Sequence, residues 1–379
     1  MREGWTYKKM SEVFDLQMGK TPDRKTPSYF GGNNVWVSIR DLVGKEIGES
    51  NEHITDTAVT TTNIRKVKKG TVIMSFKLTV GKCAITTKDL YTNEAIMAFN
   101  LKEGYDIYPD YLYYYLSNYN WKGANKAVMG MTLNKATISQ QVISYPSLSE
   151  QQSIVAELDK INELISLKKA QLSDLDSLAQ SIFYDMFGDP IENEKGWEVK
   201  KLRDLCVLCQ GLAINAQSKH LLTPSGELPL LRIKDMKEGT REIFVNSIEC
   251  PPNCIANIDD IIYTRTGTLG LVFTNMHGVL HNNCFKINID KTLLSKVYFM
   301  FYISGNDFRS NIIEQAKRSS QPDITHKLFL SQNIVLPPLS LQQEFAKRIE
   351  LIEQQKAQIS STIKDLETLL ASRMQYWFD

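Results

Sequence analysis

The sequence lacks the motifs that mark most nucleotide-dependent and cofactor-dependent enzymes. The pattern Gly-x-x-x-x-Gly-Lys-Ser/Thr is absent, so the chain has no phosphate cradle for ATP hydrolysis. It also has neither the Gly-rich cofactor loop nor the Asn/Asp-Pro-Pro-aromatic tetrapeptide of a methyltransferase, and residues 266–270 fall short of a dinucleotide fingerprint. Only five histidines occur, and they show no acid-base or metal constellation. These absences favour a binding protein over a catalyst.

Long apolar runs are also missing. No stretch approaches the roughly 20 apolar residues that cross a bilayer, and the N-terminus lacks the basic-then-apolar pattern of a signal peptide. The 42% hydrophobic and 23% charged residues are ordinary for a globular protein. We expect a cytoplasmic protein without a membrane partner.

The cysteines suggest a metal site, but weakly. Four of the six fall in the second half at spacings that zinc sites use, as Cys206, Cys209, Cys250 and Cys254. By the internal repeat described below, the first half has Phe14 and Gln17 in place of Cys206 and Cys209, so the fold forms without these thiols. Buried, reduced thiols are the favoured interpretation, and we expect no metal in this chain.

One arrangement has the residue types of a metal-dependent nuclease. Asp189 precedes Glu198 and Lys200, a carboxylate pair and a lysine that could hold a divalent ion and an attacking water. The first half has no acid in the place of Glu198. A surface turn that leaves a helix is therefore the favoured alternative.

What the chain does contain is a copy of itself. Gly4-Trp5 returns as Gly196-Trp197, and residues 148–152 return as 339–343, at an offset of about 191 or 192 positions. Residues 37–41 and 71–81 recur as well, at 231–235 and 260–270. A repeat of this length indicates a duplicated domain and not a solenoid. Duplication suggests that two equivalent partners are bound.

Charge follows the repeat. Residues 1–148 carry a net charge of +5 (19 Lys and Arg against 14 Asp and Glu), and residues 149–187 carry −4 (3 against 7). The second copy gives +1 for 188–337 (17 against 16) and −1 for 338–379 (5 against 6). The mild basic excess of the globular parts is compatible with nucleic acid but does not establish it.

Each globular part is predicted to be rich in strands. Short runs of Val, Ile, Thr and Tyr alternate with Gly, Pro, Asn and Asp, which is typical of strands and turns. A helical interruption is expected at 110–116 and again at 296–303. Its aromatic residues could stack on bases, but their helical spacing favours a place in the core.

A long helix is predicted to follow each globular part. No Pro or Gly occurs from 147 to 187, and apolar residues recur there in steps of four and three over five heptads. The first seam is Ile154, Leu158, Ile161, Ile165, Lys168, Leu172, Leu175, Ala179, Ile182 and Met186. The second is Phe345, Ile349, Ile352, Lys356, Ile359, Ile363, Leu366, Leu370, Arg373 and Trp377.

The two helices are the simplest partners for each other. Capping boxes at Ser149 with Gln152 and at Ser340 with Gln343 would start helices of about 38 residues, or roughly 55 Å. We predict an α+β fold in which two strand-rich domains are separated by an antiparallel two-helix coiled coil with approximate twofold symmetry. The predicted domains are residues 1–146 and 189–337, and the helices occupy 147–188 and 338–379.

The whole chain resembles the DNA-specificity subunits of type I restriction-modification systems. Three segments carry the resemblance: 146–152 (PSLSEQQ), 183–190 (FYDMFGDP) and 337–343 (PPLSLQQ), where Leu341 replaces the acid of the usual motif. The resemblance implies two target-recognition domains, each reading half of an asymmetric, interrupted DNA site. It also implies that catalysis belongs to partners.

The resemblance further implies which partners these are. Two adenine methyltransferase subunits would dock on the helices and two ATP-dependent restriction subunits may join, so S-adenosylmethionine, Mg²⁺ and ATP would be used by partners and no cofactor by this chain. Outside the seams, apolar residues are left for such docking or for packing on the chain's own domains: Val155, Leu164, Leu167, Leu178, Phe183, Leu351 and Leu369.

Candidate DNA-reading residues are polar residues in loops that recur in both copies with different content, because such loops would read different half-sites. The candidates are Lys20, Arg24, Lys25, Ser38, Arg40, Lys77, Thr79, Asn134 and Lys135 in the first copy, and Arg232, Lys234, Arg265, Thr266, Gln321, Thr325 and His326 in the second. Arg and Lys suit guanine, and Asn and Gln suit adenine. Contact with phosphate is the alternative role for each.

Two alternative functions stay open. A stand-alone DNA-binding adaptor or repressor would bind DNA specifically without a methyltransferase. A nuclease built on Asp189, Glu198 and Lys200 would cut DNA with Mg²⁺ alone.

Overall fold

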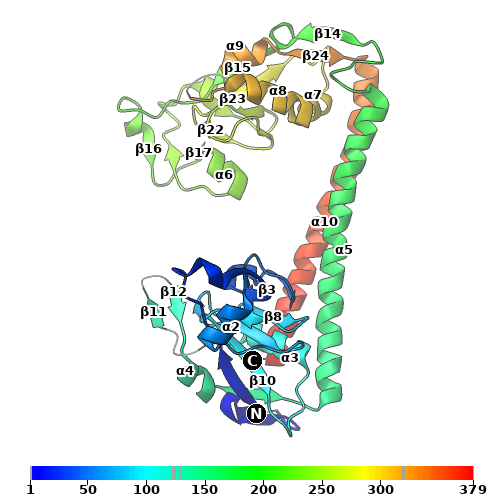
Figure 1. Cartoon of the computed structure of the whole chain (residues 1–379). Helices are drawn as coiled ribbons and strands as arrows, with labels where there is room; N and C mark the ends of the chain where they lie inside the picture. Colours follow the sequence, from blue (N-terminus) through cyan, green and yellow to red (C-terminus); the bar gives the residue numbers. More distant parts are fainter. Residues whose placement is uncertain (1, 122–124, 128–129, 318–320, 379) are drawn as a thin grey trace. The chain divides into compact units, whose positions relative to one another are not determined.

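A computed structural model describes residues 2–121, 125–127, 130–317 and 321–378. The chain forms two units: unit 1 comprises Met1–Ala170 and Ser360–Asp379, and unit 2 comprises Gln171–Ile359. The boundaries fall inside the two long helices, α5 (Leu148–Phe187) and α10 (Leu339–Phe378) (Figure 1). Each unit therefore contains one globular part and one half of each helix.

Unit 1 is strand-rich, as predicted. Its elements before α5 are β1 (Thr6–Lys9), α1 (Met10–Val13), β2 (Phe14–Met18), η1 (Pro27–Tyr29), β3 (Phe30–Val37), η2 (Ile39–Asp41), β4 (Glu46–Ile47), β5 (His53–Ile54), α2 (Asp56–Thr62), β6 (Val72–Ser75), β7 (Lys77–Leu78), β8 (Cys83–Thr86), β9 (Tyr91–Thr92), β10 (Ile96–Leu101), α3 (Pro109–Asn118), β11 (Asn125–Ala127), β12 (Gly130–Thr132), α4 (Lys135–Gln140) and β13 (Val142–Tyr145). Its largest sheet has the strand order β2-β10-β6-β8-β4, and α3 packs on β6 and β8.

Unit 2 repeats the central strands of this plan. Its elements between α5 and α10 are β14 (Glu198–Lys201), η3 (Leu202–Asp204), β15 (Cys206–Gln210), η4 (Lys219–Leu221), β16 (Leu222–Thr223), β17 (Leu228–Leu231), α6 (Ile233–Glu238), β18 (Phe244–Val245), η5 (Pro252–Cys254), β19 (Ile255–Ala256), β20 (Ile261–Thr264), β21 (Val272–Phe273), β22 (Gly278–Leu280), β23 (Cys284–Ile289), α7 (Lys296–Ser304), α8 (Asn306–Ala316), α9 (His326–Leu330) and β24 (Asn333–Leu336). The order β15-β23-β20 in unit 2 corresponds to β2-β10-β6 in unit 1.

The repeated Gly19 and Gly211 end equivalent strands where another backbone comes very close. A Cβ atom on Gly19 would lie 2.2 Å from the carbonyl oxygens of Thr92 and Asn93, and one on Gly211 would lie 2.4 Å from that of His281. No side chain fits at such distances. This explains the glycine in both copies.

The aromatic residues of α3 and α7 belong to the core, as their spacing predicted. Tyr111 and Tyr298 are completely buried, and burial raises the pKa of both hydroxyls far above the usual value. Each hydroxyl donates to the strand before a long helix: Tyr111 to the Ser144 carbonyl at 2.8 Å, and Tyr298 to the Val335 carbonyl at 2.7 Å. These rings are not available to stack on bases.

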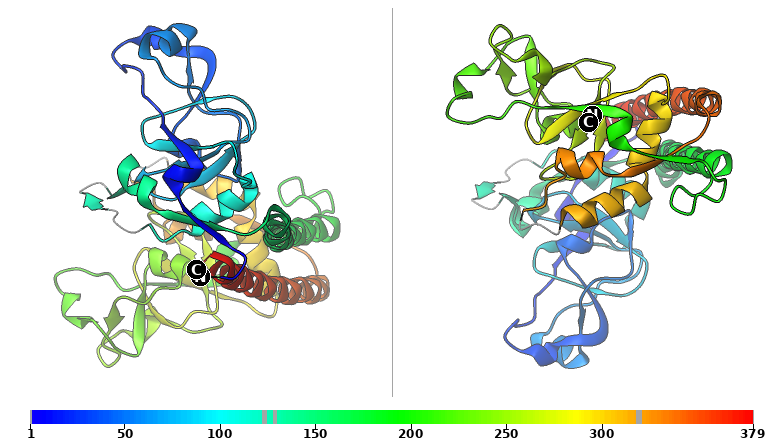
Figure 2. Two further views of the ribbon diagram at one scale, coloured as in Figure 1. Left: turned by 90° about the horizontal axis from the view of Figure 1, so that it is seen from below. Right: turned by 90° about the horizontal axis from the view of Figure 1, so that it is seen from above.

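The predicted heptad seams are confirmed, since every seam position of α5 and α10 is buried or half-buried. In unit 1, Lys169 pairs with Glu367 at 3.0 Å and Glu157 pairs with Arg373. The partners run in opposite directions along the chain, so the helix segments are antiparallel and lie side by side (Figure 2).

Unit 2 shows the same antiparallel pairing. The ring of Phe187 lies 5.2 Å from that of Phe345, and Lys356 pairs with Asp176 at 2.7 Å. Burial acts to lower the pKa of Lys356, but the hydrogen bonds to Asp176 and Glu353 outweigh it and raise that pKa. The lysine in the seam therefore stays charged and paired.

The predicted capping boxes are wrong. Both helices begin before the predicted caps, at Leu148 and Leu339, which places Ser149 and Ser340 within the first turn. The hydroxyl of Ser147 accepts from the amide of Glu150 at 3.4 Å and does the capping in unit 1. In unit 2, the Pro338 carbonyl accepts from the amides of Leu341 and Gln342.

The glutamines of the repeated motif have a different role. Gln151 is completely buried, and its amide donates to the carbonyls of Asp106 (2.9 Å) and Pro146 (3.0 Å) and accepts from the amide of Tyr108 (2.8 Å). One side chain thus satisfies three backbone groups at the junction between the loop before α3 and the start of α5.

Gln342 makes the same three bonds in unit 2. It donates to the carbonyls of Leu293 (3.0 Å) and Pro337 (2.8 Å) and accepts from the amide of Ser295 (2.9 Å). It is also completely buried. The long helix and the globular part are therefore joined in the same way in both units.

Gln342→Ala is expected to lower the free energy of unfolding by about 1–3 kcal/mol, because it leaves buried backbone groups without partners. The exposed neighbour Gln343 provides the control, and Gln343→Ala is expected to change the free energy of unfolding by less than about 0.5 kcal/mol. Thermal unfolding of the two variants measures the difference. Equal midpoints would contradict the role of the buried amide.

Candidate functional site

The basic loop after Gly19 is largely engaged with its own unit. Lys20 donates to the Thr62 carbonyl at 2.6 Å. Arg24 forms a two-pronged ion pair with Glu52, and its guanidinium lies 4.7 Å from the ring centre of Phe30; the bond to Glu52 raises the pKa of Arg24. Lys25 is exposed, and its side chain pairs with none of the described residues. Of the three, Lys25 fits a phosphate contact best.

Ser38 and Arg232 occupy equivalent positions and perform the same local task. The amide and hydroxyl of Ser38 both donate to Asp41 at 2.8 Å, and the guanidinium of Arg232 donates to Asp235 at 2.6 and 2.9 Å. Burial acts to raise the pKa of Asp41, but hydrogen bonds from Ser38 and Asn51 hold it below its usual value. Ser38 is thus committed to local structure.

Lys234 and Arg40, the remaining basic residues of these two segments, differ in whether an acidic side chain pairs with them. Glu242 pairs with Arg232 at 2.7 Å and with Lys234 at 3.3 Å. Its hydrogen bond to Arg232 raises the pKa of that guanidinium further, after the larger contribution of Asp235. Arg40 is exposed and pairs with none of the described side chains. Arg40 is therefore the better candidate for contact with a ligand.

Both units contain one turn built in the same way, after β6 and after β20. The buried hydroxyls of Ser75 and Thr264 each donate to a carbonyl four residues later and accept an amide seven residues later. The amides of Gly81 and Gly270 close the turns on the carbonyls of Ser75 and Thr264, both at 3.0 Å. The backbone is the same, but the side chains it presents are not.

The turn is joined in both units to the loop before a short helix. The Leu133 amide donates to the Phe76 carbonyl at 2.8 Å, and the Ile324 amide donates to the Arg265 carbonyl at 2.9 Å. In each unit, two groups of predicted residues are thereby brought together. They are Lys77, Thr79, Asn134 and Lys135 in unit 1, and Arg265, Thr266, Thr325 and His326 in unit 2.

Two of these residues also cap the short helices. Asn134 accepts from the Thr137 amide at 2.8 Å and starts α4, and Thr325 accepts from the Leu328 amide at 3.1 Å and starts α9. Their recurrence in the sequence is therefore explained by capping. Lys135 follows the first cap and is exposed, which leaves it open to a ligand.

Unit 2 gathers a polar cluster around Arg265. Its guanidinium binds both carboxylate oxygens of Asp323 and donates to Gln210 at 2.9 Å, and Gln210 in turn donates to the Asn282 carbonyl at 2.7 Å. Neither Asp323 nor Gln210 was among the predicted residues. Gln210 directly precedes the repeated Gly211, a signal that could have identified it; Asp323 had no such signal.

Two histidines beside the cluster are held neutral. Burial lowers the pKa of His326, and the positive charge of Arg265 lowers it further. Burial and the charge of Arg232 do the same to His281, whose Nδ1 accepts from the Asn283 amide. The Nε2 of His326 and the hydroxyl of Thr266 are buried and have no hydrogen-bond partner among the residues that the structure describes. The cluster therefore holds unsatisfied polar atoms beside a fixed guanidinium.

Gln321 is exposed and lies just before Asp323 in the same loop. At the same repeat offset, unit 1 has Gly130, which lies in β12 between β11 and β7. Both positions lie at the border of the clusters.

The nuclease-like residues do not form a site. Asp189 accepts from the amides of Ile191 (2.7 Å) and Glu192 (3.2 Å), so its carboxylate closes the turn after α5, as the alternative reading expected. Glu198 pairs with Lys200 at 3.5 Å on β14. Within the described ranges, no three His, Cys, Asp or Glu side chains are grouped as metal ligands.

Burial favours the protonated thiol at three of the four candidate zinc ligands. Burial raises the pKa of Cys206 to about 12 and also raises those of Cys250 and Cys254. The Cys206 thiol donates to the Leu202 carbonyl at 3.1 Å. Cys209, which is half-buried, accepts from the Asn288 amide at 3.6 Å. These environments disfavour the thiolate that zinc requires.

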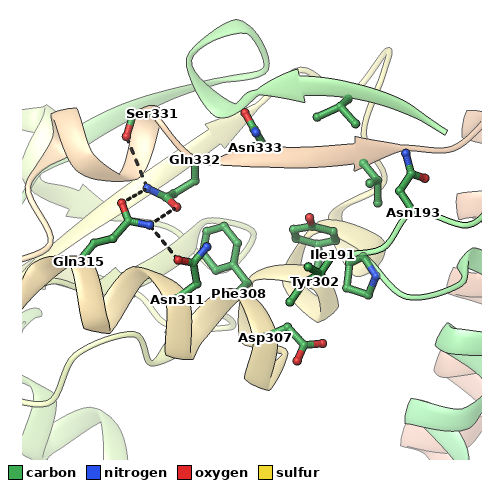
Figure 3. A pocket seen from close by; sticks show the side chains of 13 residues that line it. Ile191, Asn193, Tyr302, Asp307, Phe308, Asn311, Gln315, Ser331, Gln332 and Asn333 are labelled. Carbon is green, nitrogen blue, oxygen red and sulfur yellow. Dashed lines mark hydrogen bonds between the residues drawn. The ribbon is translucent and has the colours of Figure 1, made fainter. Parts of the chain in front are cut away.

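A pocket of about 470 Å³ lies elsewhere in unit 2, between α8, β24 and the turn after α5. Its wall carries a ladder of amides in which Gln315 donates to Asn311 at 2.9 Å and exchanges two bonds of 3.3 Å with Gln332 (Figure 3). None of the predicted site residues lines it. The ladder joins α8 to the segment before β24.

Comparison with known proteins decides the family. The model of the type I restriction modification DNA specificity domain matches twice, over residues 2–176 and 194–368. The chain belongs to this family. The two matches correspond to the two copies in the sequence, so the family's DNA specificity domain is present twice in one chain.

Similar proteins extend over nearly the whole chain. The MjaIX type I restriction enzyme specificity subunit of Methanocaldococcus jannaschii is 26% identical, covering 91% of this chain and 86% of that protein. A chain from a study of complex assembly and conformational transition in the type I R-M system has a TM-score of 0.68 at 16% identity, covering 100% and 98%. The S subunit from M. genitalium has a TM-score of 0.55 at 15% identity, covering 99% and 96%.

DNA recognition is therefore the function of these two domains, and the family is not itself catalytic. The joined loops of each unit are its candidate DNA interface, because they share a backbone and differ in side chains. Across the described part of the chain, no helix combines the length and apolar character needed to cross a bilayer.

Arg265→Ala is expected to weaken specific DNA binding by roughly 5- to 150-fold, the equivalent of one lost bidentate base contact. Lys291→Ala is the control, because it removes a charge just beyond the opposite end of β23. Binding is measured on DNA altered in one half-site at a time, with thermal unfolding to detect loss of structure. An equal effect of both variants would assign Arg265 to general phosphate attraction.

Proposed function

We propose that this chain is the DNA-reading subunit of a cytoplasmic type I restriction-modification complex that recognises a bipartite, interrupted site. The observation that carries the proposal is the turn after β6 and β20. The same hydrogen bonds hold it in both units, yet its residues differ: Phe76 and Lys77 in unit 1, and Arg265 and Thr266 in unit 2. Two equivalent readers with different side chains fit two different half-sites.

The two units would read by different chemistry. In unit 2, the guanidinium of Arg265 is fixed by Asp323 and Gln210, and a fixed fork of donors suits the O6 and N7 acceptors of guanine. In unit 1, the equivalent position is the buried, apolar Phe76, and the exposed side chains belong to the residues after it. An asymmetric target follows.

Catalysis would come from partners. The proposed complex contains two adenine methyltransferase subunits that use S-adenosylmethionine. Restriction subunits that use ATP and Mg²⁺ join it where the system has them. The relative that was studied for complex assembly in the type I R-M system supports an assembly of this kind.

The long helices offer a surface for the methyltransferases in each unit. One flank of α5 is covered by the chain's own globular parts, where Val155 and Phe183 are buried. Elsewhere both helices carry exposed leucines. They are Leu164 and Leu167 of α5 and Leu369 of α10 in unit 1, and Leu178 of α5 and Leu351 of α10 in unit 2. Because each unit has such leucines, we propose one methyltransferase per unit.

Leu167→Asp, at a side chain that is 54% exposed, is expected to leave the fold intact and remove one methyltransferase from the complex. Leu351→Asp, 61% exposed in unit 2, is expected to remove the other. Ser173→Asp places the same charge at another exposed position of α5 and serves as control. The mass of each co-expressed complex is measured, and unchanged two-to-one complexes for both leucine variants would refute the docking surface.

A stand-alone DNA-binding adaptor is the second candidate, and the same co-expression separates it. A two-to-one complex that methylates adenines in an interrupted motif supports the specificity subunit. A monomer that ignores the methyltransferase yet binds DNA specifically supports the adaptor. DNA cleavage with Mg²⁺ by the chain alone would support neither.

The lengths of α5 and α10 are proposed to set the spacer between the half-sites. Seven residues inserted after Ala170 and seven after Ile359 keep the heptad seam and lengthen both helices by about 10 Å, or about three base-pair steps. The methylated motif is then expected to have a longer spacer and unchanged half-sites. Insertion in one helix alone is the control and should abolish methylation. An unchanged spacer would contradict the idea.

A further inference from the structure

Leu78 has a backbone conformation that leucine rarely adopts. Its φ angle is +65°, in the left-handed region, and the Thr79 amide donates across it to the Lys77 carbonyl at 2.8 Å. This makes a γ-turn of the rarer, strained form. Every other non-glycine residue with positive φ in the described chain is an asparagine, which tolerates this region: Asn63, Asn193 and Asn275.

Unit 2 shows what the turn itself prefers at this point. The matched hydrogen bonds of Ser75 and Thr264 make Gly267 the counterpart of Leu78, and Gly267 has a φ angle of +73°. Glycine adopts this angle without strain. The turn therefore forms without a side chain here, and the leucine of unit 1 is not explained by the fold.

The leucine side chain gains little from packing within the chain. The Leu78 side chain is 55% exposed, whereas Phe76, two residues earlier, is buried. Strain in the backbone combined with an exposed apolar side chain indicates a residue kept for contact with a ligand.

The surroundings of Leu78 identify the ligand. It lies in the turn that is joined to the loop of Asn134 and Lys135, between Lys77 and the exposed Thr79. Its backbone also pairs with Met131 of β12, so the turn is held on two sides. A single apolar group on a rigid, polar and basic loop does not suit a hydrophobic protein groove. It suits DNA, whose major groove has one apolar group, the 5-methyl of thymine.

We propose that Leu78 contacts the 5-methyl group of one thymine and so specifies an A·T pair in the half-site read by unit 1. The inference rests on the proposed DNA-reading function of this unit. Unit 1 would read that base pair by apolar contact, and unit 2, with Gly267 in the same place, would read through the hydrogen bonds of Arg265.

Leu78→Gly in the complex with its methyltransferase tests the proposal. The variant recreates the conformation of unit 2, so its unfolding temperature is expected to be equal to or above that of the wild type. Specific binding to the cognate site is expected to fall about four- to tenfold, the effect of one buried methyl contact. Leu78→Asn, which also tolerates the backbone angle, is expected to lose binding equally.

Uracil, which is thymine without the methyl, locates the contact. Each thymine of both half-sites is replaced by uracil in turn. The half-site read by unit 2 is identified as the one whose recognition Arg265→Ala changes. In the other half-site, we expect uracil at one position to weaken DNA binding by the wild type by the same factor. The same uracil is expected to leave DNA binding by Leu78→Gly unchanged. Gly267 in unit 2 has room for a Cβ atom, and Gly267→Leu is expected to leave the effect of uracil at that position unchanged.

Several results would overturn the proposal. Leu78→Gly that binds the cognate site as tightly as the wild type would overturn it. So would a uracil substitution that weakens binding by the wild type and by the variant equally. Loss of binding by Leu78→Gly without any sensitive thymine would mean that the side chain does something else, such as opening a base step. Failure of the wild-type complex to bind any DNA specifically would instead refute the proposed function itself.

Discussion

The buried amides of Gln151 and Gln342 connect the parts of this molecule that matter for its function. Each one satisfies three backbone groups in a completely buried position, where a long helix leaves its globular part. Since the helix begins at that junction, the direction in which it leaves depends on this contact. A domain that reads DNA is useful only if its helix holds it at a defined angle, and the repeated glutamine provides that angle in both units.

Much of the architecture could be predicted from the sequence because the patterns reflect burial directly. The heptad seams and the core aromatics of α3 and α7 are periodic, and periodic burial in a helix depends on little else. The helix starts could not be placed as well. Ser149 has the residue type of a cap, but the chain already turns at Ser147, and the position of that turn is set by the glutamine junction and not by local preference.

The site was harder to predict, for a physical reason. Arg24 and Arg232 were chosen because basic residues attract DNA, but the fold places Glu52 and Asp235 against them. Glu52 comes from another segment, so the sequence around Arg24 gives no sign of it. Asp235 lies only three residues after Arg232, but its spacing alone does not show that the two side chains pair. Asn134 recurs because it caps a helix, which explains a repeated polar position without any ligand. Arg265 was among the predicted residues, but its ion pair with Asp323 was not predicted.

Unit 1 is completed by residues that are made long after the rest of it. The ring of Phe378 lies 5.5 Å from that of Tyr111, and Arg373 pairs with Glu157, 216 positions earlier. At synthesis rates of roughly 5–20 residues per second, the aromatic face of unit 1 waits roughly 10–45 s for its cover while unit 2 is being made. During that time, unit 1 exposes apolar surface. A chaperone or a partner subunit of the restriction-modification complex therefore has a period in which to act before unit 1 is complete.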